Sequence, residues 1–172
     1  MIRPGDFVFC YSNGLAAKII RFGEWLRFRR GTWNHVAIVH KVEMGRVYVI
    51  QAEARGVTDC RTIDEIAPGG HYEVRRLRNV DPEQVVAFAR QEVGSKYGWL
   101  SIVSTALDLI TPLWFVAFRR AFSWICSALA GEAARCGGWL HRWADSYTVT
   151  PQALYNAFVA DEAVLVTKSG SL

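Results

Sequence analysis

The sequence predicts an α+β fold in which an antiparallel sheet packs against helices. Two observations carry this prediction: short β-rich runs dominate the first half of the chain, and helix start and stop signals dominate the second. The length of 172 residues, with 51% hydrophobic and 21% charged residues, suits a single globular unit with a buried core. We therefore expect residues 1–172 to form one domain, because no repeat or linker-like segment interrupts them.

Five runs have the composition of β-strands. β-branched and aromatic residues dominate each run, and turn-forming residues bound them. Glu43, Met44 and Gly45 separate the second run from the third, which indicates a β-hairpin. The expected strands span residues 7–11, 35–42, 46–54, 72–77 and 163–167.

Four segments carry helical signals. Residues 14–30 show apolar positions at helical spacing with basic residues between them. Asp81 followed by Pro82 is an N-cap with proline at the first helical position, and Gly94 ends that helix. Further helices are expected over residues 127–135, closed by a glycine pair, and over residues 150–158, opened by Thr150 and Pro151.

An apolar stretch lies directly before the third of these helices. Residues 100–118 are mostly hydrophobic, but Asp108 and Pro112 interrupt them. A membrane-spanning helix needs about 20 largely uninterrupted apolar residues. We therefore expect an apolar helical insert at about residues 100–122 that forms a buried or surface-lying hairpin.

Charge and cysteine content exclude several classes of protein. The net charge of +4 is mild, and its only dense cluster is Arg27, Arg29 and Arg30, so we expect no nucleic-acid partner. The four cysteines show no Cys-x-x-Cys spacing, and no phosphate-binding motif occurs, so we expect no metal and no cofactor. The N-terminus lacks the layout of a secretory signal, which predicts a cytoplasmic location.

One cysteine and one histidine are the strongest candidates for chemistry. Cys126 lies at the start of a predicted helix, where the positive end of the helix dipole lowers a thiol pKa. His35 opens a predicted strand, and imidazole is the usual base for a cysteine nucleophile. Taken singly, each is more typical of a buried structural residue; together they make a thiol hydrolase and a structural role equally good interpretations.

A cysteine–histidine pair needs a third polar group to fix the imidazole tautomer. Gln51 and Glu53 are both candidates, because residues two apart on a strand share a face. A three-residue turn in the hairpin would place His35 opposite Glu53 and diagonal to Gln51. A two-residue turn at Met44 and Gly45 would put His35 on the other face.

The remaining histidines and cysteines are expected outside the site. His40 lies five residues beyond His35, on the other face of the strand, and Cys136 lies far around the helix from Cys126. Two cysteines are expected to be structural, and two histidines beside glycine-rich turns to be exposed; they are Cys10, Cys60, His71 and His141.

Six segments occur in an order that resembles a known family. They are Gly5-Asp6, Asn34-His35, Gln51-Ala52 with Gly56-Val57, Gly94 to Gly98, Trp124 to Ser127, and Thr150 to Leu154. Together they resemble the circularly permuted branch of the NlpC-type papain-like superfamily of cysteine peptidases and amidases, which is related to lecithin:retinol acyltransferase-like proteins. His35 precedes Cys126, the order that permutation requires.

The resemblance implies a circularly permuted papain-like fold with the nucleophile at a helix N-terminus. It also implies Cys126 as nucleophile, His35 as general base and acid, and Gln51 as the orienting residue. This chain departs from the branch where glutamine replaces the common glutamate at position 51, with Glu53 two residues on. Ala128 stands where an acidic residue often follows the Cys-Ser pair, and we expect altered substrate choice.

The resemblance favours a cysteine hydrolase acting on a peptide or acyl substrate, with peptidoglycan amides the commonest class. A second hypothesis is lipid acyl hydrolysis or transfer, favoured by the insert at 100–122 and the basic, aromatic residues 18–30, with peripheral membrane contact. A third is a catalytically inactive binding domain. Without a secretory signal, a cell-wall enzyme would need release by another factor or carriage in a virus particle.

Overall fold

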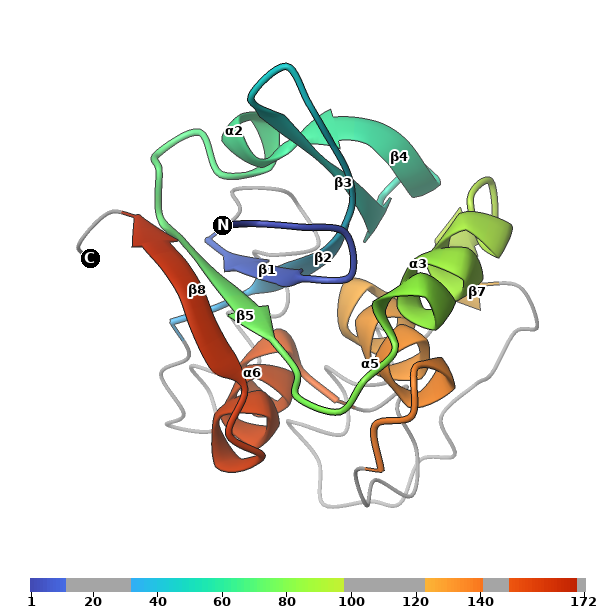
Figure 1. Ribbon diagram of the computed structural model, residues 1–172. Helices are drawn as coiled ribbons and strands as arrows, with labels where there is room; N and C mark the ends of the chain where they lie inside the picture. The colour runs from blue at the N-terminus through green and yellow to red at the C-terminus, as the bar shows by residue number, and fades with distance from the viewer. Residues whose placement is uncertain (12–31, 98–122, 141–148, 170–172) are drawn as a thin grey trace, which may run out of the picture.

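A six-stranded antiparallel sheet lies at the centre of the protein, in the order β4-β3-β2-β1-β5-β8 (Figure 1). The structure, a computed structural model, describes residues 1–11, 32–97, 123–140 and 149–169. The sheet contains β1 (Phe7–Cys10), β2 (His35–Glu43), β3 (Arg46–Glu53), β4 (Gly56–Thr62), β5 (Tyr72–Arg76) and β8 (Val164–Ser169). This arrangement confirms the expected α+β class.

Helices cover both faces of the sheet. They are α2 (Ile63–Ile66), α3 (Pro82–Gln91), α5 (Cys126–Cys136) and α6 (Pro151–Ala160). The helices α3, α5 and α6 share one hydrophobic core with the sheet, whereas α2 packs against a second core on the opposite face. Figure 1 shows α2 on the side of the sheet away from α5 and α6.

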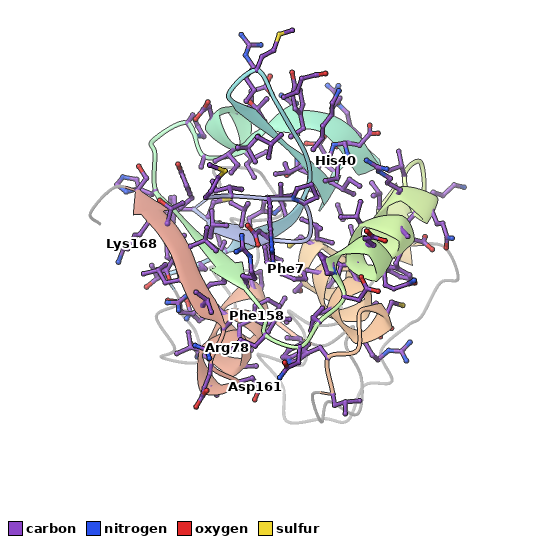
Figure 2. The ribbon with its side chains drawn as sticks, in the orientation of Figure 1. Phe7, His40, Arg78, Phe158, Asp161 and Lys168 are labelled. Atoms are coloured by element: carbon purple, nitrogen blue, oxygen red, sulfur yellow. The ribbon has the colours of Figure 1, made fainter. Side chains whose placement is uncertain are left out.

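β1 contributes side chains to both cores. Phe7 and Phe9 face α6 and meet the ring of Phe158 edge-on, with ring centroids 4.9 and 5.4 Å apart. Figure 2 labels Phe7 and Phe158. Val8 and Cys10 alternate with them and belong to the core under α2. The burial of all four side chains explains why this run is apolar throughout rather than alternating.

The five expected strands are confirmed, as are the three expected helices within the described residues. Asp81 caps α3 by accepting from the amides of Glu83 and Gln84, and Thr150 caps α6 by accepting from the amide of Ala153. The expected helix over residues 14–30 and the expected insert at 100–122 lie outside the described residues.

Three described parts of the fold went unpredicted, and the short helix α2 is one of them. The sequence of β4, GVTDCRT, has too few apolar residues for a strand signal, and its pairing with β3 forms it. A second sheet, parallel and two-stranded, joins β6 (Lys96–Tyr97) to β7 (Ser123–Trp124). Within the described ranges, no helix is long and apolar enough to cross a membrane.

The hairpin between β2 and β3 differs from the three-residue turn considered above. Glu43 pairs with Arg46, and the two residues between them, Met44 and Gly45, both have positive φ. This tight turn suits the twist of a hairpin. Alone it would place His35 on the wrong face for the site.

A β-bulge at His40 reverses that outcome. The register shifts between Val39 and Lys41, so that Ile38 pairs with Ile50. Continued toward the start of β2, this register puts His35 on the same face as Gln51 and Glu53. The extra residue in the bulge thus gives the site the alignment that a three-residue turn would have given.

A close backbone contact joins the start of β4 to the residues that precede β6. The Val57 amide donates to the Ser95 carbonyl, and the Gly94 amide donates to the Val57 carbonyl, each at 2.9 Å. Gly56 has φ +122°, and a Cβ there would lie 2.6 Å from the Ser95 oxygen. Glycine is therefore required where β4 meets the segment entering β6.

Candidate active site

Cys126 is the first residue of α5. Ile125, in extended conformation, precedes it as N-cap and offers no side-chain acceptor to the first amides of the helix. The backbone N–H groups of Ser127 and Val36 both donate to the Cys126 sulfur. The thiol is therefore buried at the positive end of a helix, with two amide donors directed at it.

The Cys126 thiol also forms a hydrogen bond with the His35 side chain. Burial by itself would raise the pKa of this thiol, but the neighbouring imidazole and the two amides outweigh burial and lower it. Burial by itself would lower the pKa of His35, but Cys126, Gln51 and Glu53 outweigh it and raise it. Both shifts favour a thiolate paired with an imidazolium.

Gln51 fixes which nitrogen of His35 faces the sulfur. The Nε2 atom of His35 lies 2.6 Å from Oε1 of Gln51. An amide oxygen only accepts, so Nε2 carries a proton and Nδ1 is the nitrogen left for Cys126. Gln51 is buried on β3, which keeps this hydrogen bond out of water.

Glu53 lies behind Gln51. Its Oε2 accepts from the amide nitrogen of Gln51, and its Oε1 accepts from the hydroxyl of Thr58, both at 3.4 Å. Of the two candidates for the third residue, Gln51 is thus the one whose side chain contacts the imidazole. The carboxylate of Glu53 orients the Gln51 amide and raises the pKa of His35 by its charge.

The other described cysteines lack these surroundings. Cys10 pairs with His35 across β1 and β2, but its sulfur lies 3.9 Å from the Ile66 carbonyl. Burial and the nearby Cys126 raise the pKa of the Cys10 thiol, so it is a poor nucleophile. Cys60 and Cys136 are exposed, and Cys136 lies at the opposite end of α5 from the site.

The other histidines lie apart from this arrangement. His40 bonds the Asp59 carbonyl through Nε2 at 3.0 Å and lines a separate cavity of about 320 Å³ beside α3 (Figure 2). The expectation that His71 is exposed was wrong. The residue is half-buried, and its ring lies near Gly69. His141 lies outside the described residues.

The structure therefore brings Cys126, His35, Gln51 and Glu53 together from α5, β2 and β3. Among the described residues, no group of three or more histidine, cysteine or acidic side chains could hold a metal ion. Sequence reasoning missed the amide of Val36 as a donor to the sulfur, because a backbone donor leaves no sequence signal. It also gave no role to Gln152, which lies in the segment Thr150 to Leu154 that contributes to the family resemblance.

No protein-family model matches this sequence, and no curated protein matches it. Function is therefore inferred from the residues and contacts of the site itself.

Proposed function

We propose that the protein is a cysteine hydrolase that cleaves an amide or ester bond through an acyl-enzyme. The observation that carries the proposal is the Cys126–His35 hydrogen bond at the start of α5, with the pKa of the thiol lowered and that of the imidazole raised. A structural cysteine needs neither shift, whereas a thiol nucleophile needs both.

The first half of the reaction follows from the positions of these groups. The thiolate of Cys126 attacks the carbonyl carbon of the substrate and forms a C–S bond. Uncapped N–H groups of the first turn of α5 are suited to bind the resulting oxyanion. His35 gives its Nδ1 proton to the leaving nitrogen or oxygen as the bond to carbon breaks.

The second half regenerates the thiolate–imidazolium pair. Neutral His35 takes a proton from water through Nδ1, and the hydroxide attacks the thioester carbonyl. The C–S bond breaks, the acid product leaves, and the sulfur recovers its ion pair with the imidazolium. Gln51 holds the Nε2 proton throughout, so that Nδ1 is the reacting nitrogen in both halves.

The fold and substrate class belong to the same proposal. An antiparallel sheet, a nucleophile at a helix N-terminus and a histidine that precedes it in the chain support a circularly permuted papain-like fold. The resemblance in sequence points to peptide amides of the cell wall as substrate. The features that favoured a lipid substrate, residues 18–30 and 100–122, lie outside the described residues.

Trapping of the acyl-enzyme tests the proposal. Wild-type protein is incubated with peptidoglycan fragments, and in a separate arm with phospholipids, and the mass of the intact protein is measured. We expect an adduct from peptidoglycan fragments on Cys126 and none in Cys126→Ala. Cys60→Ala is the matched control, because that thiol is exposed, and it should retain the adduct.

Each other outcome has a defined meaning. An adduct from phospholipids alone would replace the peptide substrate with a lipid while keeping the chemistry. Adduct formation or turnover that persists in Cys126→Ala would exclude the proposed nucleophile. An unreactive wild-type thiol in both arms would favour an inactive binding domain.

A further inference from the structure

The segment at the start of α6, residues 149–152, contacts both arms of the proposed site. The hydroxyl of Ser127, the residue after the nucleophile, donates to the Val149 carbonyl. Three residues further on, Oε1 of Gln152 accepts from the amides of Thr32 at 2.7 Å and Trp33 at 3.0 Å. These two amides lie just before β2, which begins at His35.

The side chain of Gln152 is itself oriented. Its amide nitrogen donates to Oδ1 of Asn156, one turn along α6, at 2.9 Å. This bond turns the nitrogen toward the helix and leaves the oxygen for the two amides, which use both of its lone pairs. The backbone at the base of the side chain is fixed as well, because Thr150 caps the helix and Pro151 begins it.

Other residues attach α6 to the sheet. The Tyr155 hydroxyl bonds the buried carboxylate of Glu73 at 2.8 Å and accepts from Arg75 at 3.0 Å. Phe158 is fully buried and packs against Phe7 and Phe9. Gln152, by contrast, is half-buried, and the two amides that its oxygen accepts from belong to the chain before His35 and not to the sheet.

We propose that Gln152 is a positioning residue that sets the distance between the Cys126 thiol and the His35 imidazole. Through Val149 and Gln152, one rigid helix start holds the residue after the nucleophile and the residues before the base. The inference rests on the proposed function, because that function requires the ion pair between the Cys126 thiolate and the His35 imidazolium. It assigns a task to a segment that the chemistry itself does not use.

The test measures the alkylation of Cys126 by iodoacetamide as a function of pH, residue by residue, by peptide mass spectrometry. In Gln152→Met, which keeps length but removes the acceptor, we expect the rate at pH 6 to fall about tenfold, because a small misplacement weakens the ion pair. The rate well above the ordinary thiol pKa should be unchanged. A loss of stability alone would not produce this pH-selective effect.

Two further variants sharpen the test. Gln152→Glu keeps an oxygen that accepts from the two amides, so Cys126 should be alkylated at pH 6 about as fast as in the wild type. Tyr155→Phe loosens the same helix but keeps the ring that contacts Trp33, so it should leave the pH profile unchanged. If Gln152→Met does not fold, Gln152→Ser replaces it, because its hydroxyl is too short to reach the amides.

The outcomes separate the two proposals. If Cys126 is alkylated at pH 6 as fast in Gln152→Met as in the wild type, the positioning role is overturned and the proposed function stands. The same loss in Tyr155→Phe as in Gln152→Met also overturns it, since the effect would then belong to helix docking. A wild-type Cys126 that reacts like exposed Cys60 at every pH overturns the proposed function and this inference with it.

Discussion

Replacing Gln51 with leucine tests the central hydrogen bond of the site. The His35 Nε2–H donates to Gln51 Oε1 over 2.6 Å in a buried setting. Such a bond contributes about 0.5–1.5 kcal/mol when its donor is neutral and about 1.5–3 kcal/mol when it is charged. The difference, roughly 1–1.5 kcal/mol, is what Gln51 adds to the imidazolium over the neutral ring.

The sign of the effect follows from this difference. Gln51→Leu should lower the pKa of His35 and raise that of Cys126, because the charged pair loses more than the neutral pair. Since about 1.4 kcal/mol corresponds to a factor of ten, the equilibrium constant for forming the thiolate–imidazolium pair should fall about tenfold, and the thiolate population at pH 6 should fall with it. The unpaired Nε2–H should also lower the free energy of unfolding by about 1–3 kcal/mol.

The assay compares iodoacetamide reactivity of Cys126 with that of Cys60 in the same sample at several pH values. Cys60 is exposed and serves as the internal reference. Gln51→Glu is the matched variant: it restores an acceptor and should recover the acidic reactivity. Unchanged reactivity at pH 6 in a folded Gln51→Leu protein would refute the account of how the imidazole is held.

The remaining predictions concern pH and the backbone. Because the pKa of Cys126 is lowered and that of His35 is raised, turnover should be bell-shaped in pH. Protonation of the Cys126 thiolate causes the loss of turnover at low pH, and loss of the His35 imidazolium proton causes the loss at high pH. A pH profile with only one of these two limbs would contradict the ion pair. Gly56→Ala should lower the free energy of unfolding by roughly 1–3 kcal/mol, because φ is +122° and the new Cβ would meet the Ser95 oxygen. Chemical denaturation measures this, with Gly45→Ala, whose Cβ would meet nothing, as the control for positive φ alone.

Sequence alone was sufficient wherever structure depends on neighbours in the chain. Asp81 and Thr150 predict helix starts because an N-cap bonds amides only two or three residues away. The helix that begins at Cys126 has no side-chain N-cap, and its local signal is instead the glycine pair that ends it at Gly137. The apolar runs likewise predict β1 and β2, since a short continuous apolar run is typical of a strand that is buried on both faces.

The tertiary structure decided what depends on distant pairing. The tight turn at Met44 and Gly45 would by itself have turned His35 away from Gln51, and the bulge at His40 restored the alignment. Gln152 meets Thr32 across 120 residues of sequence, which no local pattern predicts. Register and long-range contacts are fixed only when whole faces pack, so the candidate residues were visible in the sequence but their arrangement was not.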